Sequence, residues 1–119
     1  QNKAWCIHKN LNLEKIIKQA SFFEGKHDFQ SFRSIDCQSK TTLKSLESFE
    51  VKKNKDILIF SICAKSFLHS QVRIMVGTLV DIGKGLIKES ILDIIKSQNR
   101  AKAGMTAPSY GLYLKKIEY

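Results

Sequence analysis

Residues 57–85 read ILIFSICAKSFLHSQVRIMVGTLVDIGKG, and two patterns within them decide the fold. Residues 57–63 are apolar almost throughout, and most are β-branched or aromatic, which predicts a strongly buried strand. Ser66 is a suitable N-cap for a following helix, and Gly83 and Gly85 are suitable residues to end it. The apolar face of that helix repeats at three- and four-residue spacing and comprises Leu68, Val72, Met75, Val76 and Leu79.

A second strand is expected just before the first. Residues 43–51 come close to alternating between apolar and polar side chains, but Leu46 and Phe49 break strict register, which indicates a β-bulge. Residues 52–56 are polar and rich in lysine, as a turn would be. These features together predict an antiparallel hairpin. The lysines at its tip are either solvated or in contact with phosphate.

Two further helices are expected, one before the hairpin and one after the long helix. Asn12 can cap a helix over residues 12–23, with Gly25 as a natural terminator. The apolar positions of that helix are Leu13, Ile16, Ile17 and Ala20. Ser90 can cap the other helix, whose apolar positions are Ile91, Ile94 and Ile95.

Shorter segments connect these elements. Asp28 can cap a single helical turn that holds Phe29 and Phe32, and residues 34–42 are expected to form a polar loop. Residues 99–109 contain Gly104 and Pro108 and are also expected to be a loop.

A final strand is predicted over residues 111–119, with Leu112, Leu114 and Ile117 as its apolar positions. The order helix, hairpin, helix, helix, strand predicts an α+β fold in which helices pack mainly on one face of an antiparallel sheet. The length of 119 residues suits one domain, so residues 1–119 are expected to form a single domain.

The charge balance favours a polyanionic partner. Lysine and arginine number 20 against 11 acidic residues, which gives a formal net charge of +9. Neutralising phosphates releases condensed counterions, so such an excess favours nucleic acid, although scattered lysines also occur on ordinary solvated faces. The best-defined cluster is Lys96, Arg100 and Lys102, which has the same two interpretations.

Other site classes find little support in the sequence. Cys6, Cys37 and Cys63 are odd in number and widely spaced, which argues against a disulfide framework and favours a reducing cytoplasm. Cys6 and His8 lie close together, but no second ligand pair completes a zinc site. No apolar run is long enough to span a membrane. The chain begins with Gln1, as expected of a fragment or a processed product.

One row of residues on the long helix stands out. His69, Arg73 and Gly77 lie four positions apart and therefore share one side of the helix, beside its apolar face. A mid-helix glycine costs about 1 kcal/mol relative to alanine, and close approach of another backbone is the usual compensation. Arg73 is either a helix-packing residue that reaches solvent or the partner of a carboxylate or phosphate.

Three blocks of the sequence resemble the tRNA pseudouridine synthase A family. The first is GKHDFQSFR at residues 25–33, followed by CQSK at 37–40. The second is FLHSQVRIMVGTLVDIGKG at residues 67–85, and the third is TAPSYGLYL at 106–114. Ala4-Trp5 is also similar to the sequence that precedes the second half of the family. The resemblance thus spans essentially the whole chain and implies that it is the C-terminal half.

The resemblance implies an isomerase that acts on tRNA. Family members convert uridine to pseudouridine in the anticodon stem-loop, at nucleotides 38, 39 or 40, as cytoplasmic homodimers that use no cofactor or metal. The target base must leave its stack, and an aspartate carboxylate attacks the nucleotide or accepts a proton from it. That aspartate belongs to a Gly-Arg-Thr-Asp motif of the first half, which this sequence lacks. The chain alone is therefore expected to be inactive.

The resemblance also implies roles for individual residues. Arg73 matches the arginine that pairs with the catalytic aspartate, and a nearby cation keeps such a carboxylate ionised. Leu112 matches a leucine that packs against the target base; otherwise it would be ordinary strand core. Phe32 and Arg33 match a pair in the cleft region, and the resemblance makes both candidate RNA-binding residues. Arg33 either contacts phosphate or braces the next loop.

The remaining candidates are less specific. His69 either supports the cleft or RNA or simply packs, while His27 and Asp28 are expected to brace local structure. Lys102 is a candidate phosphate contact. Two other hypotheses stay open: a stand-alone RNA-binding module without catalysis, and an oligomerisation domain whose charge is incidental.

Overall fold

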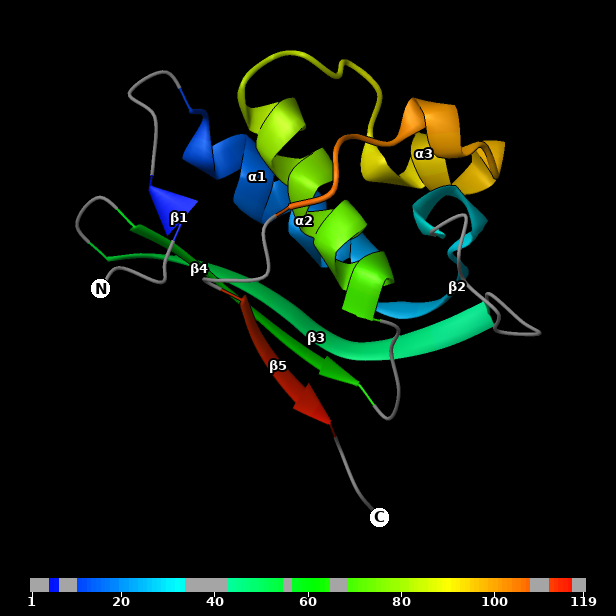
Figure 1. Cartoon of the computed structure of the whole chain (residues 1–119), viewed down its shortest axis with the longest axis horizontal. Coiled ribbons are helices and arrows are strands. Elements are labelled where there is room, and N and C mark those ends of the chain that lie inside the picture. The colour runs from blue at the N-terminus through cyan, green and yellow to red at the C-terminus, as the bar shows by residue number, and fades with distance from the viewer. Residues whose placement is uncertain are drawn as a thin grey trace.

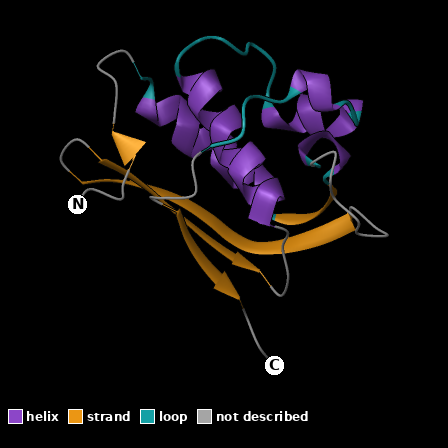
Figure 2. Ribbon diagram, viewed as in Figure 1, coloured by secondary structure: helices purple, strands orange, loops and turns teal. Residues whose placement is uncertain are grey.

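The computed structural model describes residues 5–6, 11–33, 43–54, 57–64, 69–107 and 112–116, and Figure 1 shows their arrangement. One mixed sheet carries all the helices of this described part on one face, as Figure 2 shows. The α+β class and the placement of helices on one face are therefore as predicted. Of the described helices, none is long and apolar enough to cross a membrane.

A long hairpin forms the centre of the sheet. Strand β3 (Leu43–Asn54) pairs antiparallel with β4 (Ile57–Ala64), which confirms the predicted hairpin. The register shifts between Leu46 and Ser48, and this irregularity is the predicted bulge. Strand β3 extends to Asn54, beyond the predicted end at residue 51. The reason is that the first residues of β4, from Ile57, pair with the backbone of Lys52, Lys53 and Asn54, while the Lys52 and Lys53 side chains are exposed.

Short strands complete the sheet on both sides of the hairpin. Strand β2 (Gly25–Asp28) pairs antiparallel with β3, and β1 (Trp5–Cys6) pairs antiparallel with the first residues of β4. Strand β2 was not expected, because Gly25 resembles a helix terminator. Its positive φ of 94° instead turns the chain from the first helix into the strand.

Among the described strands, β5 (Leu112–Lys116) is the exception to the antiparallel pairing expected of the sheet. It pairs parallel with β4, from Phe60↔Leu112 to Ala64↔Lys116. The chain between the two strands first crosses the helical face, so it returns to the sheet in the direction of β4, as a crossover connection does. Strands β1 and β5 thus lie along the same edge of β4, opposite β3.

The helices begin close to where the sequence predicts. Helix α1 (Leu13–Ala20) continues into the 3₁₀ turn η1 (Ser21–Phe23), and the Asn12 side chain accepts a hydrogen bond from the Lys15 N–H at 3.1 Å. Helix α3 (Ile91–Ser97) is capped by Ser90, whose hydroxyl oxygen accepts from the Asp93 N–H at 3.2 Å. Both caps are the predicted ones.

Helix α2 (His69–Gly83) is the central helix of the layer that covers the sheet. It ends at Gly83 as predicted, whereas the expected cap Ser66 and the first apolar position Leu68 lie outside the described residues. Two further 3₁₀ turns occur: η2 (Gln30–Phe32), which is the predicted single turn, and η3 (Arg100–Lys102), inside the predicted loop 99–109. Asp28 Oδ1 accepts from the Gln30 N–H at 3.2 Å, as its expected bracing role requires.

The core lies between α2 and the sheet. On α2 the side chains of Val72, Met75, Val76 and Leu79 have at most trace exposure, as the predicted apolar face requires. On β4, Leu58, Phe60, Ile62 and Ala64 are buried beneath them. Because these two faces are completely covered, the position of α2 on the sheet is fixed, and so is the row of residues beside its apolar face.

Candidate active-site arginine and the segment that holds it

Residues 104–107, here called the strap, lie along one side of α2 and lead toward β5. In Figure 1 the strap is the orange segment that runs along the green helix. Four residues of α2 hold it in place: Arg73, Gly77, Thr78 and Asp81. The predicted row of His69, Arg73 and Gly77 therefore continues to Asp81 and forms the seat of the strap.

Arg73 bonds to the last strap residue, Ala107, through both its side chain and its main chain. Its Nε–H donates to the Ala107 carbonyl oxygen at 2.6 Å, and its main-chain carbonyl oxygen accepts from the Ala107 N–H at 2.9 Å. Ala107 is fully buried, while the Arg73 side chain is only partly covered. The guanidinium is therefore anchored at Nε, while part of the side chain remains exposed.

Gly77 shows why the helix tolerates a glycine. A Cβ atom at this position would overlap the Met105 carbonyl oxygen and lie 2.8 Å from the Met105 carbonyl carbon. Gly104 faces the same contact, since a Cβ there would lie 2.9 Å from the Thr78 Cα. The strap and the helix thus meet backbone to backbone through two glycines, which is the close approach that the sequence predicted.

Thr78, Asp81 and Arg100 tie the start of the strap. The buried Thr78 hydroxyl accepts from the Gly104 N–H at 2.8 Å and donates to the Ile74 carbonyl oxygen at 2.7 Å. Asp81 Oδ2 accepts from the Met105 N–H at 3.3 Å, and Arg100 Nη1 donates to the Gly104 carbonyl oxygen at 2.9 Å. Strap backbone groups thereby obtain partners that a covered segment requires.

No carboxylate within the described part of the chain is close enough to form an ion pair with Arg73. The ion pairs in that part join Lys52 to Glu50 and Lys102 to Glu89, and both lie on the exposed surface. A guanidinium has five N–H donors, of which Nε–H is used by Ala107. The terminal Nη1 and Nη2 atoms have the planar fork geometry that carboxylates and phosphates accept.

The strap also sets the start of β5. Ala107 is five positions before Leu112, and Leu112 pairs with Phe60 of β4. The backbone of Leu112 therefore enters the sheet shortly after the strap, although its side chain lies outside the described residues. The same holds for His69, whose backbone begins α2. The predicted roles of these two residues remain predictions.

Phe32 and Arg33 differ sharply in exposure. The Phe32 ring is fully buried and meets the Phe23 ring edge-on at a centroid distance of 5.2 Å. A ring in this position offers no surface to RNA, which corrects the expectation of direct contact and makes Phe32 a core residue. Arg33 is partly exposed and follows immediately as the C-cap of η2. Phe32 thus fixes the turn from which Arg33 extends.

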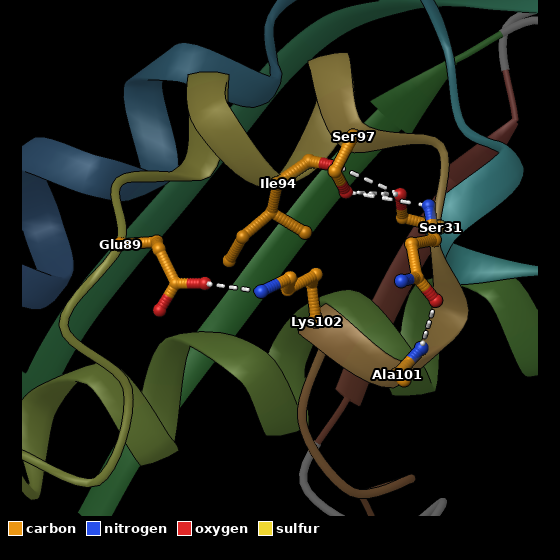
Figure 3. A network of polar contacts seen from close by, with 7 residues as sticks. Ser31, Glu89, Ile94, Ser97, Ala101 and Lys102 are labelled. Atoms are coloured by element: carbon orange, nitrogen blue, oxygen red, sulfur yellow. Dashed lines mark hydrogen bonds and ion pairs between the residues drawn. The ribbon is translucent and has the colours of Figure 1, made fainter.

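The turn η2 is bound to α3. The buried Ser31 hydroxyl donates to the Ile94 carbonyl oxygen at 2.7 Å, and Figure 3 shows this bond with the neighbouring Ser97 hydroxyl. Because η2 also lies against η3, Arg33 belongs to the same region of the surface as the predicted cluster of Lys96, Arg100 and Lys102.

The members of that cluster have different environments. Arg100 is partly buried and binds the strap, so it is chiefly a brace. Lys96 is exposed on α3. Figure 3 shows Lys102 paired with Glu89. Lys102 Nζ lies 3.8 Å from Glu89 Oε2, and about half of each side chain is exposed. Such an exposed pair contributes at most about 1 kcal/mol, so Lys102 can exchange Glu89 for a phosphate at little cost.

The contacts that three residues make in this arrangement were not predicted from the sequence. These residues are Thr78, Asp81 and Gly104. Asp81 follows Arg73 and Gly77 at the same spacing of four residues. This spacing was the signal that could have placed Asp81 on the same side of the helix. The part played by Thr78 had no signal, because a buried threonine in a helix is ordinary. Among the described residues, no group of three or more His, Cys, Asp or Glu side chains is arranged to hold a metal ion.

Sequence comparisons relate the chain to known proteins. A family model described as tRNA pseudouridine synthase matches residues 20–119. Curated relatives named tRNA pseudouridine synthase A include that of Neorickettsia sennetsu, 50% identical over 119 residues that make up 100% of this chain and 49% of the relative. That of Ehrlichia chaffeensis is 48% identical over 119 residues, covering 99% of this chain and 49% of its own length.

A more distant relative has the same coverage. The tRNA pseudouridine synthase A of Thermoanaerobacter pseudethanolicus is 43% identical over 120 residues, covering 100% of this chain and 49% of the relative. The chain thus spans about half the length of the curated relatives it matches. Since the family model covers far more than half of its residues, the chain belongs to the tRNA pseudouridine synthase family.

Proposed function

We propose that this chain is the C-terminal half of an enzyme that isomerises uridine to pseudouridine in tRNA. The observation that carries the proposal is the state of Arg73. Its side chain is anchored at Nε and partly exposed, and it has no carboxylate partner within the described residues. A carboxylate from the other half of a longer polypeptide would complete the pair.

The division of work between the two halves follows from the residues present. The sequence contains no Gly-Arg-Thr-Asp motif, so the attacking or proton-accepting carboxylate must come from elsewhere. Arg73 would keep that carboxylate ionised and fix its orientation, because an adjacent cation favours the charged form. Leu112, at the start of β5, would pack against the extruded uracil. No cofactor or metal takes part in this proposal.

The proposed substrate is the anticodon arm of tRNA, with a cytoplasmic homodimer as the functional assembly. The net charge of +9 supports a nucleic-acid partner. Arg33, Lys96 and Lys102 would contact phosphates near η2 and η3, with recognition based mainly on shape and backbone. His69, at the start of α2, would support the same cleft.

The proposal is tested by comparing the full-length protein with this chain alone. Each is incubated with unmodified tRNA, and pseudouridine is detected by mass spectrometry after chemical labelling. The full-length protein should form pseudouridine in the anticodon arm. The chain alone should form none and should bind tRNA weakly, with an affinity that falls as salt rises. Failure of the full-length protein to modify any uridine would refute the proposal.

The alternative is an RNA-binding module that performs no catalysis, which the missing Gly-Arg-Thr-Asp motif would favour only if this chain were the whole protein. The two proposals differ in one measurable respect. A non-catalytic module would bind tRNA in every form tested and leave its uridines unchanged. Binding that is weak and insensitive to salt would instead point to an oligomerisation domain, for which the basic charge is incidental.

A further inference from the structure

We propose that Thr78 and Asp81 are positioning residues, which hold the strap so that Ala107 aims the guanidinium of Arg73. This inference rests on the proposed function, in which Arg73 pairs with a carboxylate from the other half. It adds a reason for the precise placement of that arginine. Neither residue needs to touch the substrate, since both act through the strap backbone.

Thr78 makes the central hydrogen bonds between the strap and α2. Its side chain is fully buried, and its one hydroxyl both accepts from the Gly104 N–H and donates to the Ile74 carbonyl oxygen. The hydroxyl group therefore links the strap to the helix turn just after Arg73. Without it, the Gly104 N–H would lose this hydrogen-bond partner, and the strap would be expected to move away.

Asp81 holds the strap one helical turn further on. Its carboxylate accepts from the Met105 N–H, and a Cβ at Gly104 would lie 2.5 Å from the same carboxylate oxygen. The strap is thus fixed near its start by Thr78 and Asp81 and at its end by Arg73. Because four residues span a short distance, a shift at Gly104 is transmitted to Ala107.

The position of Ala107 decides which edge of the guanidinium is available. The Ala107 carbonyl oxygen occupies Nε–H, so a carboxylate cannot also use that atom in a bidentate pair along the Nε edge. The remaining bidentate geometry is the terminal one, through Nη1 and Nη2. A strap that moves would release Nε–H and allow the guanidinium to rotate, which misaligns the incoming carboxylate.

The test uses three variants of the full-length protein: Thr78→Val, Thr78→Ser and Gln19→Met. Valine keeps the shape of threonine but removes the hydroxyl, whereas serine keeps the hydroxyl. Gln19 is the matched control, because its Oε1 also accepts a backbone N–H from a distant segment, that of Ile91 at 2.8 Å. It lies on α1, away from the strap. The rate of pseudouridine formation at saturating tRNA, the KM and the melting temperature are measured for each.

Thr78→Val should lower kcat by on the order of 10- to 100-fold, the cost of a small misplacement of a catalytic group, with KM within about twofold. Thr78→Ser should restore kcat to within about threefold of wild type, and Gln19→Met should lower the melting temperature without lowering kcat. Wild-type kcat in Thr78→Val, or an equal kcat loss in Gln19→Met, would overturn the inference.

Asp81→Asn and Asp81→Leu test the second fastening point in the same assay. Asparagine keeps an oxygen that can accept from the Met105 N–H, so kcat should change little, whereas leucine should lower it as Thr78→Val does. Equal activity of the two variants would remove Asp81 from the inference. If the wild-type protein itself forms no pseudouridine, the proposed function fails, and this outcome is distinct from a failure of the variants alone.

Discussion

Arg73 and Ala107 are joined by two hydrogen bonds, and Arg73 is the donor in one and the acceptor in the other. The side-chain Nε–H of Arg73 donates to the Ala107 carbonyl oxygen, and the Arg73 carbonyl oxygen accepts from the Ala107 N–H. An arginine fixed in this way loses little further side-chain entropy when it binds an anion, which is the advantage of preorganisation. The pair also joins the helix to the segment that leads into β5.

Gly77→Ala should disrupt this junction. The added methyl group would overlap the Met105 backbone, which cannot rotate away as a side-chain tip can, so the strap must shift. The free energy of unfolding should fall by about 1–3 kcal/mol, typical of overpacking, and pseudouridine formation by the full-length protein should fall with it. Denaturant unfolding and the modification assay measure the two effects.

Gly83→Ala is the control for that substitution. Its methyl group would meet side-chain atoms of Ile16 and Leu11 near the end of α2, and not the strap backbone. It should lower stability while leaving kcat close to wild type. Equal loss of activity in both variants would show that the contact at Gly77 has no special relation to the site.

Phe32→Ala should act through the core. The ring is fully buried beside Phe23 and Phe29, so its removal should cost about 3–5 kcal/mol of unfolding free energy. Phe32→Leu should cost much less, because most of the apolar volume is kept. A Phe32→Ala protein with unchanged stability and weakened tRNA binding would instead support direct contact of the ring with RNA.

Lys102→Ala should weaken tRNA binding without affecting the fold. Its pair with Glu89 is exposed, so the unfolding free energy should change by less than about 1 kcal/mol. The slope of log affinity for tRNA against log salt concentration should become shallower by about one, because about one fewer phosphate is neutralised. Lys52→Ala is the matched control, since Lys52 forms another solvent-exposed pair, with Glu50 at 3.9 Å. Equal losses of affinity in the two variants would contradict a specific role for Lys102.

Much of the fold was predictable from local patterns. Asn12 and Ser90 mark helix starts because their side chains bond nearby backbone N–H groups, and the bulge near Leu46 is visible as a break in alternation. Pairings between distant segments were not predictable. The sequence contains no local signal that β5 runs parallel to β4, because that direction depends on the path of the chain over the helices.

In the candidate site, too, local features were predictable and contacts between distant segments were not. The spacing of Arg73 and Gly77 predicted a shared helix side and a close backbone contact, and both are present. The identity of the contacting segment depends on tertiary structure, so Thr78 and Asp81 could not be assigned. Phe32 was assigned to RNA on resemblance alone, and its complete burial shows that a matched motif position can serve the core.

Arg73 has the central part in the proposed function of the full-length protein. Arg73→Ala removes the guanidinium, and Arg73→Lys keeps the charge but lacks the fork that binds Ala107 and a carboxylate together. The decisive measurement is the single-turnover rate of pseudouridine formation by both variants, with the melting temperature recorded alongside. The rate should fall by about two to three orders of magnitude in each folded variant, whereas a near-normal rate in Arg73→Ala would contradict the assignment.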